Sequence, residues 1–365
     1  MEIIAYYLPQ YYPFRENDEW WGEGFTEWTN VGKANRLYRG HYQPKVPANL
    51  GYYDLRLPEV RSAQVNLAIE AGVTGFCYWH YWFGNGKQLL DMPFKEVLLS
   101  GKPDFPFCLG WANESWKAKV WSGADGSSND KLLIEQLYPG LDDIEAHFYS
   151  VLPAFNDKRY IKIDGKPIFV IYKPLMLHKA SEFIAVWNRL AKLNNIPGGI
   201  FFIGHTVNVS ERSKITEVGF DAVNVVRVGE YRFNKDVIKK IPYKLFKFKF
   251  FGSPLVINYS FISQYFVQKE EIEEDLFPTL IPNWDHTPRS GRRGVVFHNS
   301  TPELFNKHAK KVIDIVKNKK RQIIFLKSWN EWGEGNYMEP DLKYGKKYIN
   351  ALSQAIADSC VTTSK

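Results

Sequence analysis

The chain has 365 residues, of which 45% are hydrophobic, and a net charge of +7. This length accommodates one large domain or two of ordinary size, and the apolar content is enough for a full core. Three cysteines without a CxxC pair argue against a disulfide scaffold and against a thiolate zinc site. No apolar run approaches the length of a membrane span, and no signal-peptide pattern precedes the first apolar run, so a cytoplasmic location is expected.

Apolar runs typical of strands alternate along the chain with segments typical of helices. Strands are expected at residues 3–8, 73–79, 105–111, 168–172, 199–205, 220–227, 279–284 and 321–328. Helices are expected at residues 58–71, 142–155, 181–194, 302–319 and 346–357. This alternation predicts the α/β class, as a single (β/α)8 TIM barrel over residues 1–365 with long loops after its strands. A doubly wound sheet is the alternative, which the absence of GxGxxG and GxxxxGK motifs disfavours.

A basic and aromatic insertion interrupts the alternation around residues 230–255. Between residues 232 and 253 six lysines accompany a single acid, Asp236, and phenylalanines lie among them. Such a mixture is typical of segments that lie on an anionic membrane surface, so we expect peripheral membrane contact through residues 232–253. The alternative is an irregular segment that only covers the barrel. No nucleic-acid-binding motif accompanies the charge, so nucleic acid is not expected as a partner.

Polar and aromatic side chains follow nearly every predicted strand. Because active sites of these barrels form at the C-terminal ends of the strands, we expect these side chains to bind substrate. They are Gln10, Trp79, His80, Trp82, Trp111, Asn113, Glu114, Tyr172, Lys173, His205, Trp284, Asp285, Arg289, Trp329, Asn330 and Trp332. The loop after the first strand adds Glu27 and Trp28, which are placed to roof the site. Asp285 and Arg289 are expected to pair.

Residues 326–335 carry two carboxylates, an amide and two indoles directly after the last strand. Two carboxylates are the minimum for general acid/base catalysis at a glycosidic bond, with one protonated and the other ionised, so Glu331 and Glu334 are the predicted catalytic pair. Gly333 and Gly335 permit the turn that brings them together. Trp329 and Trp332 are expected to offer flat faces to a sugar ring. The alternative is a glutamate-rich first turn of a helix. The histidines lack metal-ligand spacing, so neither a metal nor a cofactor is expected.

Seven motifs together resemble one known family. They occupy residues 20–28, 41–44, 75–79, 111–116, 164–167, 284–289 and 329–335. These motifs resemble the WbsX-type proteins, which are named glycosyltransferases and are associated with lipopolysaccharide and capsule loci. Those proteins are similar in turn to glycoside hydrolase family 99, the endo-α-mannosidase-type (β/α)8 barrels.

The resemblance implies a specific role for each carboxylate. Glu331 would take the proton of the sugar 2-hydroxyl, so that this oxygen attacks the anomeric carbon and forms a 1,2-anhydro sugar. Glu334 would act first as the general acid and then as the base, with net retention. The chain contains no Asp-x-Asp motif, which nucleotide-sugar transferases often carry.

These observations favour a carbohydrate-active enzyme. The leading hypothesis is a retaining glycosidase or transglycosylase acting on a bacterial surface-polysaccharide-type glycan, with an α-mannoside-like linkage among the options. The first alternative is a glycosyltransferase of lipopolysaccharide, O-antigen or capsule biosynthesis. The second is a carbohydrate-binding barrel without activity. The expected partner is an oligo- or polysaccharide, free or linked to a lipid.

Overall fold

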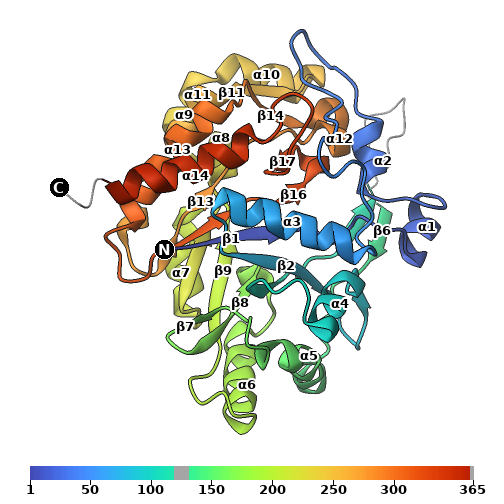
Figure 1. The fold of residues 1–365 in the computed structure, drawn as a ribbon, viewed down its shortest axis with the longest axis vertical. Helices are drawn as coiled ribbons and strands as arrows, with labels where there is room; N and C mark the ends of the chain where they lie inside the picture. Colours follow the sequence, from blue (N-terminus) through green and yellow to red (C-terminus); the bar gives the residue numbers. More distant parts are fainter. Residues whose placement is uncertain (119–130, 362–365) are drawn as a thin grey trace.

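A computed structural model of the protein describes residues 1–118 and 131–361 (Figure 1). Its centre is a nearly closed barrel of parallel strands, in which the first strand pairs with the last, in the register Ile4 to Phe325. The barrel strands are β1 (Glu2–Tyr7), β2 (Gly75–Trp82), β4 (Phe107–Trp111), β8 (Lys166–Ile171), β9 (Phe201–Thr206), β10 (Ala222–Val225), β12 (Leu276–Phe277), β13 (Thr279–Leu280) and β15 (Ile323–Leu326). The predicted (β/α)8 barrel is therefore confirmed, and the doubly wound sheet is wrong.

The seventh position of the barrel is divided in two at Pro278. β12 pairs with β10 and β13 pairs with β15, so the two short strands close the ring together. Proline has no N–H to donate, which explains the break. The strand predicted at residues 279–284 instead ends at Leu280, because Pro282 cannot extend the ladder and the Asn283 side chain pairs with the backbone of Tyr337.

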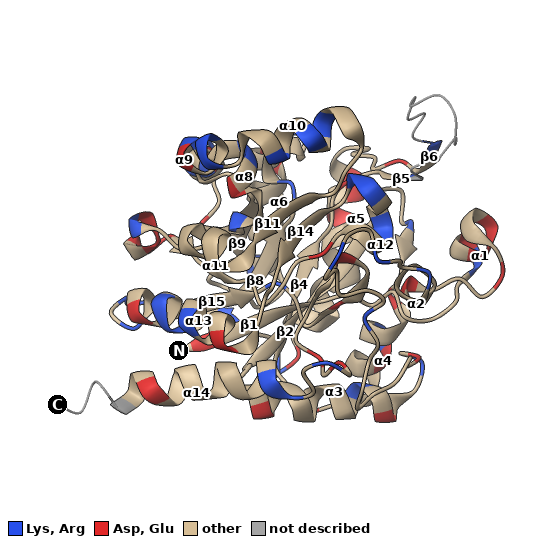
Figure 2. Cartoon of the chain, turned by 90° about the horizontal axis from the view of Figure 1, so that it is seen from above, with Lys and Arg blue, Asp and Glu red and all other residues tan. Residues whose placement is uncertain are grey.

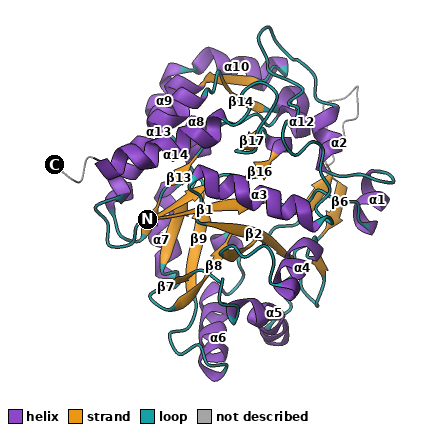
Figure 3. Ribbon diagram, viewed as in Figure 1, coloured by secondary structure: helices purple, strands orange, loops and turns teal. Residues whose placement is uncertain are grey.

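Helices surround the barrel (Figure 3), and those predicted to begin near residues 58, 142, 181, 302 and 346 lie close to their expected positions. The surrounding helices are α3 (Pro58–Ala71), α4 (Met92–Ser100), α5 (Leu141–Phe155), α6 (Ala180–Leu193), α7 (Arg212–Glu217), α13 (Pro302–Val316) and α14 (Lys347–Val361). Of these, α4 and α7 were not predicted. α3 begins at a proline and ends before Gly72, whose φ of 82° suits a glycine stop. In Figure 1, α14 lies beside α3 and α13, so helices from opposite ends of the chain complete the outer layer.

Aromatic side chains fill the barrel interior. The Tyr6 ring of β1 stacks on Trp79 of β2 and on Phe325 of β15, and its hydroxyl donates to Asn224 of β10 at 2.7 Å. These contacts join strands on different sides of the barrel, so the interior is a packed core rather than a channel. A substrate site therefore has to lie above this core, among the loops that follow the strands.

Those loops carry secondary structure of their own. They contain α1 (Arg15–Trp21), α2 (Glu27–Gly32), β3 (Gln88–Leu89), the hairpin of β5 (Trp116–Ala118) and β6 (Lys131–Ile134), α12 (Thr287–Ser290), β16 (Asn330–Glu331) and β17 (Asn336–Tyr337). β7 (Lys162–Ile163) lies instead before β8 and pairs with its first residues. A small parallel pair, β11 (Leu255–Asn258) and β14 (Val295–His298), lies outside the barrel.

The insertion is helical rather than irregular. It consists of α8 (Glu230–Phe233), α9 (Lys235–Lys240) and α10 (Pro242–Phe251), followed by α11 (Tyr259–Ile262). Val237 and Ile241 pack with Leu255 and Ile257 in a second apolar cluster, which attaches these helices to β11. The irregular alternative is therefore wrong. Within residues 1–118 and 131–361, no helix combines the length and the apolarity that crossing a bilayer requires.

Candidate active site

A cavity of ≈ 570 Å³ lies above the packed core, among the loops at the C-terminal ends of the barrel strands. Its volume falls within the usual range for small-molecule sites. β1, β2, β4, β8 and β15, or the residues that follow them, all contribute to its wall, as active sites of this fold require. The lining residues are Leu8, Gln10, Asn17, Trp21, Phe25, Glu27, Asn30, Lys33, Trp79, Tyr81, Ala112, Glu114, Ser115, Trp116, Lys117, Leu133, Tyr172, His286, Arg289, Ser290, Lys327, Glu331 and Glu334.

Glu331 and Glu334 reach this cavity from one tight turn. Glu331 ends β16, and Glu334 ends the 3-10 turn η7 (Trp332–Glu334). Gly335 then reverses the chain with a φ of 54°, where a Cβ would meet the Asp285 side chain at 2.6 Å. The turn expected from the glycines is present, and the alternative of a longer helix that starts here is wrong.

Arg289 is the central cation of the site. Its Nη1 lies 2.6 Å from Glu334 Oε1 and 3.8 Å from Glu331 Oε1. Its Nε and Nη2 donate to the two Glu27 oxygens at 2.9 and 3.0 Å, which is a bidentate pair. Lys327 Nζ lies 3.1 Å from Glu331 Oε2 and 3.9 Å from Glu334 Oε2. Two cations therefore neutralise most of the negative charge of the three glutamates.

The two candidate catalytic carboxyls have opposite pKa shifts. Burial raises the pKa of Glu331, and the neighbouring charge of Glu334 raises it further, against the effect of Lys327. Burial also acts to raise the pKa of Glu334, but Arg289 and Lys327 outweigh it and hold this pKa well below its usual range. Of the two carboxyls in the ligand-free site, Glu331 is therefore the one that takes up a proton more readily.

Asp285 does not pair with Arg289 as expected. Its Oδ2 accepts from Gln43 Nε2 at 2.7 Å and contacts His41 Nε2 at 2.8 Å, while Oδ1 accepts from the backbone and hydroxyl of Thr287. These partners hold the pKa of Asp285 below its usual value despite its burial. The Asp285 N–H donates to the Glu334 carbonyl at 2.8 Å, so the backbone of this residue holds the turn that carries Glu334, while its carboxylate holds the start of α12.

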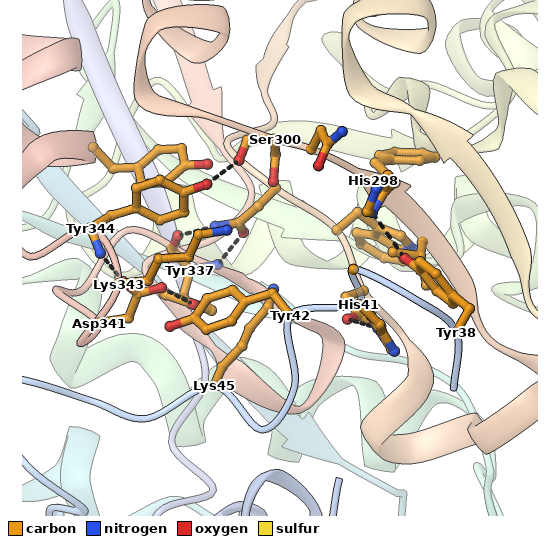
Figure 4. A pocket seen from close by; sticks show the side chains of 18 residues that line it. Tyr38, His41, Tyr42, Lys45, His298, Ser300, Tyr337, Asp341, Lys343 and Tyr344 are labelled. Atoms are coloured by element: carbon orange, nitrogen blue, oxygen red, sulfur yellow. Dashed lines mark hydrogen bonds and ion pairs between the residues drawn. The ribbon is translucent and has the colours of Figure 1, made fainter. Parts of the chain in front are cut away.

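A second, smaller pocket lies behind this anchor (Figure 4). Trp284 and Asp285 line this pocket rather than the larger cavity. Figure 4 shows Tyr38, His41 and His298 at one end and Asp341, Lys343 and Tyr344 at the other. Its volume of ≈ 40 Å³ leaves no space for a sugar ring, so the expected substrate contact of Trp284 and Asp285 is not available in this structure.

Trp329 and Trp332 do not face the cavity, and the expectation that they stack on a sugar is wrong. Both are fully buried. Trp332 stacks on Tyr337 with ring centroids 3.8 Å apart, and its Nε1 donates to Glu339 at 2.6 Å. Trp329 packs on Phe76. The indoles of the motif thus form the wall that supports the carboxylates from behind.

Strand alternation separates the aromatic residues of β2. Trp79 and Tyr81 line the cavity, whereas His80 and Trp82 point into the helical layer. There His80 Nε2 lies 2.9 Å from His147 Nε2, and the Trp82 ring stacks on the His147 ring. Burial lowers the pKa of His80 to about 4, which keeps this imidazole neutral. Sequence reasoning missed Tyr81, although its spacing of two residues from Trp79 was a usable signal.

Other expected substrate contacts are structural instead. Trp111 is buried and donates to the Trp82 carbonyl at 2.9 Å, and His205 is buried against the rings of Trp79 and Tyr172. The Trp28 indole donates to a backbone carbonyl at 2.7 Å. These three side chains do not line the cavity and support it from outside.

Two asparagines among the expected contacts hold neighbouring loops. The Asn330 side chain bonds both the N–H and the carbonyl of Leu8, at 2.8 and 3.0 Å. The Asn113 side chain bonds the backbone of Lys173 in the same way. Lys173 itself places its ammonium 4.5 Å above the Tyr172 ring and does not line the cavity.

Eight of the residues expected at the site do line the cavity. They are Gln10, Glu27, Trp79, Glu114, Tyr172, Arg289, Glu331 and Glu334. Burial raises the pKa of Glu114, against the effect of Lys173. Sequence reasoning missed Asn17 and Lys327, among others, and no signal in the sequence marks Asn17. Over residues 1–118 and 131–361, no group of three or more His, Cys, Asp and Glu side chains is arranged to hold a metal ion.

Gly333→Ala is expected to destabilise the protein. A Cβ at this position would lie 1.9 Å from Glu27 Oε1, so the methyl group has to displace the carboxylate that binds Arg289. We expect a loss of about 1–3 kcal/mol in chemical denaturation, the usual cost of overpacking. Gly32→Ala is the matched control, because a Cβ there meets nothing within 4 Å. Equal stability of the two variants would contradict the close approach of Glu27.

A comparison of the sequence with protein-family models assigns the family. The model described as "Glycosyltransferase WbsX" matches residues 3–352, nearly the whole chain. The chain belongs to this WbsX family. The relatives called "Uncharacterized protein WxcX", from two strains of Xanthomonas campestris pv. campestris, are 33% identical over 359 residues. That match covers 97% of the chain but 49% of each relative, so this WbsX chain spans about half the length of the curated relatives it matches.

Solved structures similar to the WbsX chain include glycoside hydrolases. The GH99 endo-α-mannosidase of Bacteroides thetaiotaomicron matches with a TM-score of 0.61 and 17% identity, covering 100% of this chain and 99% of that one. A "Glycoside hydrolase-like protein" matches with a TM-score of 0.57 and 15% identity, over 97% and 93% of the two chains. These matches show a shared fold. Family and fold together support a carbohydrate-active enzyme. The single domain over residues 1–365 stays a prediction.

Proposed function

We propose that this chain is a retaining glycosidase or transglycosylase acting on a bacterial surface-polysaccharide-type glycan, with an α-mannoside-like linkage as the first candidate. The observation that carries the proposal is that Glu331 and Glu334 flank one cation in a cavity of suitable size. Their facing oxygens lie 3.8 and 2.6 Å from the same Arg289 nitrogen, so their separation cannot exceed the sum of these distances. That bound includes the roughly 5–5.5 Å of retaining pairs and ends near the lower limit of the roughly 6.5–9.5 Å of inverting pairs, so product analysis has to decide the stereochemistry.

In the proposed mechanism the substrate supplies its own nucleophile. Glu331 removes the proton of the sugar 2-hydroxyl, and the 2-oxygen bonds to the anomeric carbon. At the same time the bond between the anomeric carbon and the leaving oxygen breaks, and Glu334 protonates that oxygen. Glu334 then deprotonates a water or a sugar hydroxyl, which attacks the anomeric carbon and opens the three-membered ring. Glu331 returns its proton to the 2-oxygen, and the two displacements give retention.

The proposed roles require a proton on Glu334, whereas in the ligand-free site Glu331 has the raised pKa and Glu334 the depressed one. A sugar hydroxyl that donates to Glu331 stabilises its ionised form, and a leaving oxygen that displaces Arg289 from Glu334 removes the contact that depresses the pKa of that carboxyl. Substrate binding itself is thus expected to move the proton between the carboxyls.

The proposal is tested with bacterial polysaccharides and aryl glycosides as substrates. We expect cleavage or transfer of at least one glycan, and proton NMR of the first product should show the anomer of the substrate. A first product with inverted configuration would contradict the mechanism. A protein that binds a glycan without changing it would instead be a non-catalytic binding barrel.

A second candidate function is a glycosyltransferase of lipopolysaccharide, O-antigen or capsule assembly. The description of the matching family model favours it. This candidate predicts that an activated sugar donor is consumed in the presence of an acceptor glycan, without cleavage of that glycan. The same product analysis therefore separates the two candidates.

We further propose that the substrate is linked to a lipid and that the insertion contacts the membrane. On α10 the side chains of Tyr243, Phe246, Phe250 and Phe251 are at least half exposed, and no acidic residue lies in this helix. Figure 2 shows blue segments along α9 and α10, which mark their lysines. Aromatic rings that enter the lipid interface, with lysines that face anionic headgroups, are the two components of peripheral membrane binding.

Vesicle flotation tests this contact. The protein is expected to float with vesicles that contain phosphatidylserine, and Phe250→Ser/Phe251→Ser should weaken this binding at least about tenfold, since each aromatic side chain contributes apolar burial. The control is Leu99→Ser/Leu193→Ser, because these leucines are similarly exposed but lie on other helices. Absence of the wild-type protein from both anionic and neutral vesicle fractions would leave the insertion with a structural role only.

A further inference from the structure

We propose that the outer part of the cavity is a subsite for a sugar residue that carries an anionic group, a carboxylate or a phosphate. Asn17, Lys33, Trp116 and Lys117 form this rim subsite. The inference rests on the proposed function in one respect, namely that the cavity accommodates a glycan. It adds the chemical class of that glycan, which neither the family match nor the similar structures specify.

Charge distinguishes the rim from the floor of the cavity. On the floor Arg289 and Lys327 are matched by Glu27, Glu331 and Glu334. At the rim Lys33 and Lys117 are exposed, and neither forms an ion pair with an acid in residues 1–118 and 131–361. Glu114 is the remaining acid of the lining, and it forms no ion pair with these lysines. Among residues 1–118 and 131–361, no carboxylate forms an ion pair that neutralises this positive charge of the rim.

Asn17 provides an independent sign of a missing ligand. It lies in α1, lines the cavity and is fully buried. Neither its amide nitrogen nor its amide oxygen has a hydrogen-bond partner within the described part of the chain. Leaving a buried polar group unsatisfied costs about 1–3 kcal/mol, so such groups mark places where a partner is to be expected. A sugar hydroxyl satisfies both atoms, and a carboxylate or phosphate oxygen satisfies the amide N–H.

Trp116 offers a flat face on which the sugar ring can stack. This indole belongs to β5 and packs edge-on against Trp20, Tyr81 and Phe83, with centroid distances of 5.9, 5.1 and 5.5 Å. Three rings thus fix its orientation at the cavity wall. An indole packed against three rings, with a polar amide and two lysines lining the same cavity, matches a pyranose with a charged substituent, since stacking, hydrogen bonding and charge pairing are all provided.

The experiment measures binding and needs no turnover. Protein labelled with nitrogen-15 is titrated with glucose, glucuronate and glucose 1-phosphate, and the indole N–H signal of Trp116, assigned with Trp116→Phe, is followed by NMR. We expect at least one of the two anionic sugars to bind at least tenfold more tightly than glucose. The comparison between glucuronate and glucose 1-phosphate tells a carboxylate-bearing sugar from a glycosyl phosphate.

Two sets of variants assign the preference to the rim. Lys33→Gln/Lys117→Gln is expected to abolish the preference for the anionic sugars over glucose. Lys162→Gln/Lys192→Gln is the control, because it removes the same charge from exposed lysines outside the cavity. Asn17→Ala should weaken the binding of all three sugars. Asn17→Asp should weaken the binding of the two anionic sugars more than that of glucose.

The outcomes separate this inference from the proposed function. Equal binding of glucose and both anionic sugars, no shift of the Trp116 signal with any of them, or a preference that survives Lys33→Gln/Lys117→Gln would overturn the rim subsite. Failure to cleave or transfer any glycan, with the anionic preference intact, would overturn only the proposed activity.

Discussion

Glu334→Gln is expected to slow substrates with poor leaving groups by about 10²–10⁴-fold and to leave those with good leaving groups nearly unchanged. Only a poor leaving group needs the proton that Glu334 is proposed to donate. Glu331→Gln should slow both kinds of substrate alike, because the attacking 2-oxygen loses its base. Rates for a series of aryl glycosides, compared as kcat/KM, measure the difference.

The ligand-free electrostatics make this comparison decisive. Since the pKa of Glu331 is raised and that of Glu334 is depressed, the opposite assignment, with Glu331 as the acid, is the alternative that the experiment has to eliminate. In that case the leaving-group dependence would appear in Glu331→Gln instead. Undiminished activity of Glu334→Gln on a poor leaving group would remove this residue from the acid role.

Arg289→Met is expected to destabilise the protein by about 3 kcal/mol, toward the lower end of the range for breaking a buried ion pair, because 24% of the Arg289 side chain is exposed. The substitution leaves Glu27 and Glu334 without their main cation. Adding Glu27→Gln should restore part of the loss by removing one of the uncompensated charges. Chemical denaturation gives the free energies of unfolding.

The effect of Arg289→Met should depend on pH in a defined direction. The folded-state pKa of Glu334 is depressed, so its contribution to stability is fully present above the unfolded pKa of about 4.3 and is lost as the pH falls through the folded value. The difference in the free energy of unfolding between wild type and variant should therefore have its full size at pH 7 and decrease below about pH 4.

Arg189→Gln is the control for the loss of an arginine. Arg189 pairs with Glu145 at 2.7 Å, but both side chains are largely exposed, so less than about 1 kcal/mol should be lost. A similar loss in both variants would mean that Arg289 does not serve as the buried counter-ion of the site.

The fold was predictable from the sequence because strands and helices alternate with clear boundaries. Residues 58–71 form a helix with the expected ends, since a proline begins it and a glycine stops it. The seventh strand was placed too late because residues 279–284 are apolar enough for a strand, whereas Pro278 and Pro282 determine where the ladder can run. Hydrophobicity locates a strand, but the hydrogen bonds available to its backbone set its limits.

The site was predictable in part. The sequence identified the carboxylates and Arg289, because they lie in the loops that follow the barrel strands, where active sites of this fold form. It failed for the indoles, since Trp329 and Trp332 are as suited to packing as to sugar binding and only the path of the chain decides between the two. Asn17 was missed because a single asparagine in a surface helix has no distinguishing pattern, and only its lack of partners in the folded chain makes it notable.

Two charged contacts, one in the cavity and one behind it, join residues that lie far apart in the sequence. Glu27 meets Arg289 across 262 residues, and His41 meets Asp285 across 244. Contacts of such long sequence separation form late, since large loops have to close first. An unfinished chain that ends before residue 289 therefore holds most barrel strands but lacks the cation that neutralises Glu27. We expect β1 of such a nascent chain to lack its pairing with β15. The shifted pKa values of Glu331 and Glu334 are expected only after the whole barrel has been synthesised.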